Sequence, residues 1–184
     1  MNPWQLKRAA RIIHGGGIIA YPTEAVYGLG CDPLNPDAVL RLLALKQRPV
    51  EKGLILIAAE LAQLAPFIAP LHETDLATVN ATWPGPVTWL LPARPDTPTW
   101  LRGEHHSIAV RITAHPLAAA LCRAAGQAIV STSANPGGLP PARTALSVKR
   151  YFSDQVDLIL PGALDKAAQP TTIRDLRSGR IIRP

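Results

Sequence analysis

Apolar residues recur along this chain at two spacings, one typical of helices and one typical of buried strands. Where they return every three or four positions, helices are predicted over residues 3–14, 36–46, 61–64, 73–82, 116–125 and 144–152. Where short apolar runs stand between turn-forming residues, strands are predicted over residues 18–21, 54–57, 87–91, 108–112, 128–130 and 156–160. Asn2-Pro3 and Asn35-Pro36 supply a cap and a first-turn proline for the first two helices. Residues 172–182 are predicted to form a hairpin that turns at Ser178-Gly179.

Helices and strands alternate in this pattern, which is typical of an α/β fold. The closing hairpin and the prolines between Pro84 and Pro98 favour a sheet that mixes parallel with antiparallel strands. No internal repeat, low-complexity segment or change of composition marks a linker. A chain of this length buries roughly 70% of its unfolded surface, which is enough for a substantial core. We therefore expect a single α/β domain over residues 1–184, in which helices flank a mixed sheet.

Composition and charge narrow the class of protein. The sequence is 47% hydrophobic and 17% charged, which excludes a disordered polyelectrolyte. Its net charge of +6 favours an anionic partner such as a nucleotide, RNA or an acidic substrate, with a merely basic surface as an equally weighted alternative. Cys31 and Cys122 have neither disulfide-framework nor zinc-site spacing, which is normal in a reducing compartment. Because the sequence shows neither a signal peptide nor an apolar run of about 20 residues, we expect a soluble, cytoplasmic protein without a membrane segment.

Three cations, Lys46, Arg48 and Lys52, follow the second predicted helix. Attraction to the negative end of the helix dipole explains Lys46 well, Arg48 partly and Lys52 poorly. Pro49 drives Arg48 towards an extended conformation and ends the helix, so the group is expected on a loop. We therefore favour an anion-binding role for these side chains over a solvated helix end.

Short hydroxyl and amide side chains occupy residues 131–135, between the strand predicted at 128–130 and a Pro-Gly-Gly turn. Their hydroxyls and backbone amides can converge on phosphate oxygens, although an ordinary polar turn has the same composition. The run Gly15-Gly16-Gly17 is a different case, because it follows a helix and precedes a strand, the reverse of a phosphate loop. We interpret those glycines as a helix stop.

Arg111 interrupts an apolar strand, where an unpaired charge is costly to bury. Either the strand exposes one face to water, which the spacing slightly favours, or Arg111 points into a cleft and binds a carboxylate or phosphate. Residues 21–30 are predicted to leave a strand and form a loop. Glu24 lies in this loop, where it positions an amine or a metal, or caps the loop; these alternatives stay open. His105 and His106 are adjacent and no histidine has metal-ligand spacing, so no metal site is predicted.

Together these motifs resemble the YrdC (TsaC) family of threonylcarbamoyl-AMP synthases. The likeness spans nearly the whole chain and rests on residues 21–30, 46–55, 83–88, 109–112, 131–135 and 171–175. Its most specific part is the combination of Lys-x-Arg at Lys46 and Arg48 with Ser-x-Asn at Ser133 and Asn135. The fold that the resemblance implies is a twisted, mixed α/β sheet around a deep, basic cavity.

The resemblance implies a nucleotidyltransferase that makes L-threonylcarbamoyladenylate from ATP, L-threonine and bicarbonate or CO2, and releases pyrophosphate. The product serves the threonylcarbamoyladenosine modification of tRNA, so protein partners of that transfer machinery, and tRNA or double-stranded RNA, are expected. Mg²⁺ is expected to arrive with the phosphates, because the sequence shows no carboxylate cluster. Carried over by position, ATP would contact Lys46, Arg48, Lys52, Ser133, Asn135 and Arg183. Threonine would contact Thr23, Arg111 and Ser131, and the catalytic residues would be Lys46, Arg48 and Arg111.

Two departures point to a short, single-domain subtype of that family. Ala25 stands where the longer members have threonine, and the chain stops at Pro184 without their additional C-terminal domain. A partner protein or the chain's own loops would then have to close the site.

The implied chemistry needs no enzyme nucleophile, because the amine of threonine attacks CO2 and the resulting carbamate displaces pyrophosphate. Orientation and fixed positive charge can therefore supply most of the acceleration. The competing prediction is a non-catalytic module that binds double-stranded RNA or rRNA, which the positive net charge would also suit. A weaker one is a carbamoyl-phosphate-handling enzyme that shares the fold.

Overall fold

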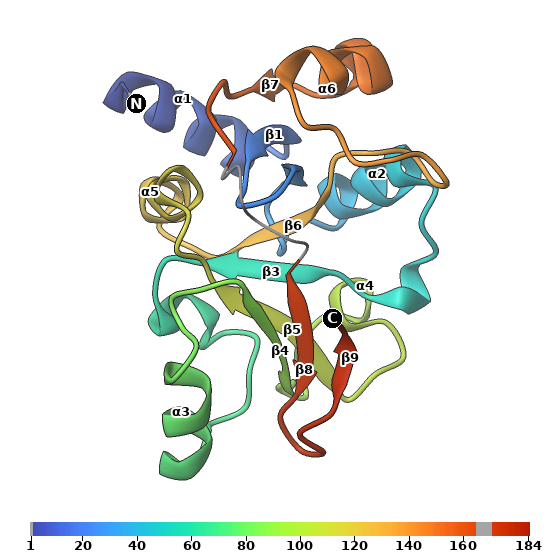
Figure 1. Ribbon diagram of the computed structural model, residues 1–184. Coiled ribbons are helices and arrows are strands. Elements are labelled where there is room, and N and C mark those ends of the chain that lie inside the picture. Colours follow the sequence, from blue (N-terminus) through green and yellow to red (C-terminus); the bar gives the residue numbers. More distant parts are fainter. Residues whose placement is uncertain (1, 165–170) are drawn as a thin grey trace.

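The strands of this protein form one twisted sheet. The computed structural model describes residues 2–164 and 171–184. The strands are β1 (Ile19–Pro22), β2 (Tyr27–Gly30), β3 (Ile55–Ala58), β4 (Val87–Pro92), β5 (Ser107–Ile112), β6 (Ile129–Ser133), β7 (Leu158–Ile159), β8 (Thr172–Asp175) and β9 (Ile181–Arg183). Within the described ranges they form a nine-stranded sheet in the order β7-β1-β2-β6-β3-β5-β4-β8-β9. Figure 1 shows the strand direction turning steadily through the sheet, from β3 and β6 to β8 and β9.

Parallel and antiparallel pairs are mixed in the sheet, as predicted. The pairs β1 with β7, β3 with β5 and β4 with β8 are parallel. The remaining neighbours are antiparallel, and β8 with β9 forms the predicted closing hairpin. The predicted fold class, a mixed α/β sheet with flanking helices, is therefore confirmed.

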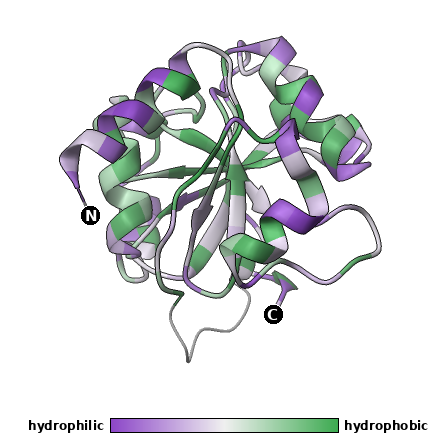
Figure 2. Cartoon of the chain, turned by 90° about the horizontal axis from the view of Figure 1, so that it is seen from above, coloured by the Kyte–Doolittle hydropathy of each residue, from purple (hydrophilic) through white to green (hydrophobic). Residues whose placement is uncertain are grey.

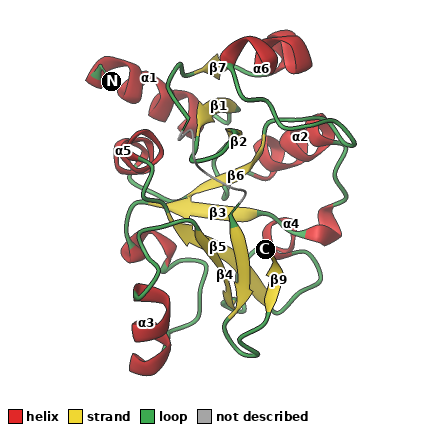
Figure 3. Cartoon of the chain, in the orientation of Figure 1, coloured by secondary structure: helices red, strands yellow, loops and turns green. Residues whose placement is uncertain are grey.

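The helices pack on the two faces of this sheet (Figure 3). They are α1 (Pro3–His14), α2 (Pro36–Lys46), α3 (Glu73–Asn80), α4 (Thr99–Arg102), α5 (Pro116–Ala125) and α6 (Ala145–Phe152), with 3-10 turns η1 (Val50–Lys52), η2 (Leu61–Leu64) and η3 (Ser153–Gln155). Successive strand residues enter different apolar clusters: Leu56 packs with residues of α2, α3 and α6, whereas Ile57 packs with residues of α1 and α5. Figure 2 shows these apolar positions gathered on the strands and the inner helix faces. Among the described residues, no helix combines the length and the apolar content needed to cross a membrane.

The first two helices begin where the sequence predicts. Asn2 Oδ1 accepts a hydrogen bond from Trp4 N, and Asn35 Oδ1 accepts one from Ala38 N, each at 3.0 Å. Gly15 caps the end of α1, where its N–H donates to a carbonyl of the last turn. The interpretation of the first glycine run as a helix stop is confirmed.

Strand β2 lies in a segment that was predicted to be a loop. Its glycines alternate with Tyr27 and Leu29, which hides the apolar alternation of a strand. A Cβ atom at Gly30 would lie 2.6 Å from Val130 O and 2.9 Å from Tyr21 Cε1, so the close approach of β2 to its neighbours requires glycine. The prediction of a loop here was wrong.

One further helix and one strand boundary differ from the prediction. Helix α4, a single turn, was not predicted, because four residues are too few to show helical spacing. Strand β6 extends to Ser133, so the hydroxyls of Ser131 and Thr132 are presented by a strand rather than by a turn.

Candidate functional site

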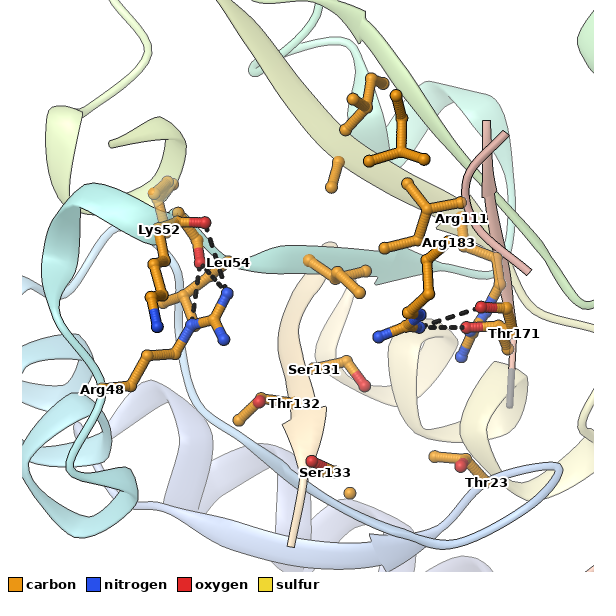
Figure 4. Close-up of a pocket in the computed structure, with 18 of the residues that line it drawn as sticks. Thr23, Arg48, Lys52, Leu54, Arg111, Ser131, Thr132, Ser133, Thr171 and Arg183 are labelled. Carbon is orange, nitrogen blue, oxygen red and sulfur yellow. Dashed lines mark hydrogen bonds between the residues drawn. The ribbon is translucent and has the colours of Figure 1, made fainter. Parts of the chain in front are cut away.

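A cavity of about 480 Å³ opens beside the strands that carry most of the predicted site residues (Figure 4). Register places Ile55, Ala109 and Leu90 side by side on the sheet face that forms its floor. Its polar lining consists of Thr23, Arg48, Lys52, Arg102, His105, Ser107, Arg111, Ser131, Thr132, Ser133, Thr171 and Arg183. No aspartate or glutamate is among the described residues of the lining. The volume is typical of a small-molecule site, which usually measures about 300–1,000 Å³.

Most of the predicted site residues meet at this cavity. Those that line it are Thr23, Arg48, Lys52, Arg111, Ser131, Ser133 and Arg183. Figure 4 shows Arg48 and Lys52 at one end and Arg111 with Arg183 at the other, with the hydroxyl-bearing end of β6 between them. Segments far apart in the chain thus place cations at both ends of a single hollow.

The cations of the cavity lie close enough to repel one another. Arg48 is held by the carbonyl of Gly53, to which its Nε and Nη2 donate at 3.2 and 2.9 Å. Burial, and then Arg183, lower the pKa of Arg48, while burial, and then Arg111, lower the pKa of Arg183. An anion bound among these guanidinium groups would relieve both the desolvation and the repulsion, so the arrangement favours anionic ligands.

Arg111 is buried, which corrects the weak preference for an exposed strand face. Its residue is 4% exposed, and its Nη2 donates to Glu24 Oε2 at 3.3 Å. β5 lies between β3 and β4 within the sheet, and the face that carries Arg111 forms the cavity floor instead of meeting bulk water. A carboxylate partner accounts for the charge inside an apolar strand.

Glu24, whose role the sequence left open, is therefore the partner of this arginine. Its Oε1 accepts a hydrogen bond from Thr113 Oγ1 at 2.8 Å. Arg111 Nε is buried and has no hydrogen-bond partner among the described residues. The guanidinium thus keeps donor capacity beyond its bond to Glu24.

Lys46 and Asn135 do not line the cavity, although the resemblance assigned them to ATP. Lys46 is 7% exposed and its Nζ donates to Ser133 O and Asn135 O, both at 2.6 Å, and to Asn135 Oδ1 at 2.8 Å. Ser133 Oγ lies 3.3 Å from the same ammonium group and donates to Asn135 Oδ1 at 2.6 Å. Burial, and then Arg48, lower the pKa of Lys46 from 10.5 to about 8. The geometry makes Lys46 a brace for the end of β6.

Hydroxyl groups surround the Arg111 end of the cavity. Ser131 Oγ accepts a hydrogen bond from the buried Tyr21 hydroxyl at 2.9 Å. Burial raises the pKa of Tyr21, so this phenol stays protonated and remains a donor. Thr23 Oγ1 donates to Val26 O at 2.7 Å, which fixes the turn between β1 and β2. Ala25, one of the two departures noted in the sequence, also lines the cavity.

Some lining residues were not predicted from the sequence. The carbonyl and the hydroxyl of Thr171 accept hydrogen bonds from Arg183 Nη2 at 2.9 and 3.3 Å. Thr171 could have been predicted, because it belongs to residues 171–175, one of the segments that carry the family resemblance. Arg102 reaches the cavity from the unpredicted helix α4, and its Nη1 donates to His105 O at 2.8 Å. Apart from that resemblance, no spacing in the sequence distinguishes Thr171 or Arg102 from ordinary surface residues.

Within residues 2–164 and 171–184, no group of three or more histidine, cysteine, aspartate or glutamate side chains is placed to hold a metal ion. Glu24, which stands between the lining residues Thr23 and Ala25, already accepts from Thr113 and Arg111.

Comparison with known proteins relates this chain to one family. The model for Sua5_yciO_yrdC, described as "Telomere recombination", matches residues 11–184. A curated threonylcarbamoyl-AMP synthase from Nitrosococcus oceani is 57% identical over 180 residues, which cover 98% of this chain and 97% of that protein.

Solved structures share the fold over the whole chain. The structure of P. abyssi Sua5 complexed with L-threonine is 32% identical with a TM-score of 0.92, and the match covers 100% of this chain and 55% of that one. This chain therefore spans about half the length of that protein. The structure of E. coli YciO is 27% identical with a TM-score of 0.86, and the match covers 99% of this chain and 89% of that one.

Proposed function

Because the chain belongs to the Sua5/YciO/YrdC family, we propose that it is a threonylcarbamoyl-AMP synthase. In this reaction ATP, L-threonine and bicarbonate or CO2 give L-threonylcarbamoyladenylate and pyrophosphate. The observation that carries the proposal is a single cavity of about 480 Å³ with cations at both ends and hydroxyl groups between them. Such a cavity can hold a polyphosphate at one end and an amino acid at the other.

The nucleotide phosphates occupy the end formed by Arg48 and Lys52. Both side chains line the cavity, and neither forms a salt bridge with a described residue, so both are available to phosphate oxygens. Ser133, between the two ends, and Arg183, which lies beside Arg111, complete the ATP contacts where the nucleotide extends along the cavity. Lys46 and Asn135 contribute to ATP binding through the position of Ser133, to which Lys46 is bonded directly.

The threonine molecule occupies the other end, with its carboxylate on Arg111. Thr23 and Ser131, which line the cavity beside this arginine, contact the rest of the amino acid. A planar guanidinium binds a carboxylate through parallel hydrogen bonds, and Arg111, which lines the cavity, has donors beyond its bond to Glu24. In this assignment the two substrates approach one another beneath the hydroxyls of β6.

The residues of the cavity promote the reaction by orientation and by charge. The neutral amine of threonine forms the C–N bond with CO2 and releases a proton to solvent, which gives a carbamate. A carbamate oxygen then bonds to the α-phosphorus as the bond to pyrophosphate breaks and pyrophosphate leaves. Negative groups must meet in the second step, so fixed cations that line the cavity, such as Arg48 and Arg111, lower its barrier, and Lys46 assists them by holding Ser133 in place. Mg²⁺ arrives with ATP as part of the substrate and shields the leaving pyrophosphate.

The product serves the threonylcarbamoyl modification of tRNA, in a cytoplasmic setting with partner proteins that consume the adenylate. Residues 1–184 act as a single domain in this proposal, and the loops or a partner close the cavity. The alternative of a non-catalytic RNA-binding module is not favoured, because a bounded cavity of this volume suits a small ligand better than an RNA surface.

Mass spectrometry of the reaction products tests the proposal. The protein is incubated with ATP, L-threonine, bicarbonate and Mg²⁺, and each component is omitted in turn. We expect threonylcarbamoyladenylate only in the complete mixture. An adenylate product that forms equally well without threonine would contradict the assigned acceptor.

A further inference from the structure

Arg111 differs from the other cations of the cavity, because it has an ion-pair partner. Its Nη2 lies 3.3 Å from Glu24 Oε2, whereas the other lysine and arginine side chains of the lining form no salt bridge with any residue that the structure describes. At the end formed by Arg48 and Lys52 the positive charge is therefore uncompensated, whereas at the other end Glu24 compensates the charge of Arg111 and leaves that of Arg183.

The carboxylate of Glu24 is held in place from two sides. Thr113 Oγ1 donates to Glu24 Oε1 at 2.8 Å, and the same hydroxyl accepts from His115 N at 3.1 Å. Glu24, Arg111 and Thr113 are 8%, 4% and 2% exposed. A buried carboxylate with two fixed donors does not swing away when a ligand arrives, so it stays in place beside the cavity.

Glu24 also lies directly behind the wall of the cavity. The residues on either side of it, Thr23 and Ala25, line the cavity, while Glu24 itself does not. Its partner Arg111 does line the cavity and leaves Nε without a partner among the described residues. A ligand therefore touches the arginine but experiences the electric field of both groups.

A counter-ion at this position changes which ligands Arg111 selects. An arginine without one attracts every anion, including the phosphates and bicarbonate that the proposed reaction requires elsewhere in the cavity. With Glu24 nearby, a ligand that carries only a carboxylate is repelled by the glutamate, whereas a ligand that also carries an ammonium group is attracted to it.

We infer that Glu24 is a specificity-determining residue, which makes the Arg111 end of the cavity selective for an α-amino acid zwitterion over anions that lack the ammonium group. This inference deepens the proposed function and rests on it. Arg183 lies near Arg111 and adds a second positive charge at this end. Without the charge of Glu24, two cations would face the ligand unopposed.

The test compares two ligands with two forms of the full-length protein. The ligands are L-threonine and 2,3-dihydroxybutanoate, which keeps the carboxylate and the β-hydroxyl but has a hydroxyl in place of the ammonium group. Their dissociation constants are measured by ligand-observed NMR titration for the unmodified protein and for Glu24→Gln. The amide introduced by this substitution can still bond to Arg111 and Thr113, so the change removes the charge and keeps the shape. Glu51→Gln, at an exposed carboxylate on η1, is the matched control.

We expect the unmodified protein to prefer threonine by about tenfold or more, the effect of one unit charge several ångströms away at an effective dielectric constant of about 20. Glu24→Gln should bring this ratio close to one, while Glu51→Gln leaves it unchanged. A purely structural role for Glu24 would weaken both ligands by the same factor and leave the ratio intact, and that result overturns the inference.

Three further outcomes separate the inference from the proposed function, and the first two need only the unmodified protein. A ratio near one in the unmodified protein refutes the selectivity without any variant. Absence of threonine binding in the unmodified protein contradicts the proposed function, and the inference with it, whereas threonine binding with an unaltered ratio in Glu24→Gln removes the inference alone.

Discussion

Replacement of Lys46 by methionine separates a bracing role from direct contact with ATP. Methionine keeps the apolar stem of the lysine and removes the ammonium group, which bonds to Ser133 O and Asn135 O at 2.6 Å and to Asn135 Oδ1 at 2.8 Å. The two carbonyl oxygens lose their hydrogen-bond donor, and each unsatisfied oxygen lowers the stability by about 1–3 kcal/mol. Part of this loss is offset, because methionine has no charge that must be removed from water. We expect a net loss of about 2–4 kcal/mol in the free energy of unfolding.

Thermal unfolding and ligand titration measure this effect. For a protein of this size, a loss of that magnitude lowers the unfolding temperature by about 5–15 °C. ATP affinity should fall roughly tenfold or more, because Ser133 shifts, while threonine affinity changes much less. Lys149→Met, at an exposed lysine of α6, is the control and should leave both quantities unchanged.

The variant Lys46→Arg decides between position and charge. Arginine keeps the positive charge but its planar, larger head cannot reproduce the three short bonds, so we expect losses similar to those of Lys46→Met. The reasoning is refuted if Lys46→Met unfolds at the same temperature as the unmodified protein, or if Lys46→Arg retains full ATP affinity.

Three other predictions follow from the same geometry. Arg111→Ala should weaken threonine binding at least tenfold more than ATP binding, and Lys52→Ala should do the reverse, in titrations of each ligand; equal losses would contradict the partition of the cavity. Gly103→Ala should lower the free energy of unfolding by roughly 2–4 kcal/mol in denaturant titrations, because φ there is +62° and a Cβ would lie 2.1 Å from Glu51 O; an unchanged midpoint would contradict this. Lys46 has a pKa of about 8 in the folded protein and 10.5 ordinarily, so between these pH values the unfolded chain binds more protons than the folded one. The free energy of unfolding of the unmodified protein, relative to that of Lys46→Met, should therefore rise from pH 8 to 10.5. A difference that falls over this range would refute the assignment.

Local sequence patterns predicted most of the elements, because helical spacing, caps and apolar runs are properties of short segments. The capped starts of α1 and α2 follow from Asn2 and Asn35 alone. β2 was missed because Gly28 and Gly30 occupy positions where close packing excludes a side chain. A glycine required by tertiary contact looks, in the sequence, like a glycine required by a turn.

The site was predictable as a set of residue types, but not as an arrangement. Periodicity could not show that the face bearing Arg111 is the floor of a cavity, because burial depends on the strands and loops that cover it. The bond between Lys46 and Asn135 joins residues 89 positions apart, and no local pattern carries that information. The resemblance assigned both residues to ATP; in the structure they are hydrogen-bonded to one another and are not among the residues that line the cavity.

A crystal structure of the protein with L-threonine and a non-hydrolysable ATP analogue tests the central claim most directly. The claim is that one cavity holds the nucleotide phosphates at Arg48 and Lys52 and the amino acid at Arg111. We expect the threonine carboxylate within hydrogen-bond distance of the Arg111 guanidinium, and the phosphates at the opposite end. Phosphates bound at Arg111, or either ligand bound outside the cavity, would contradict it.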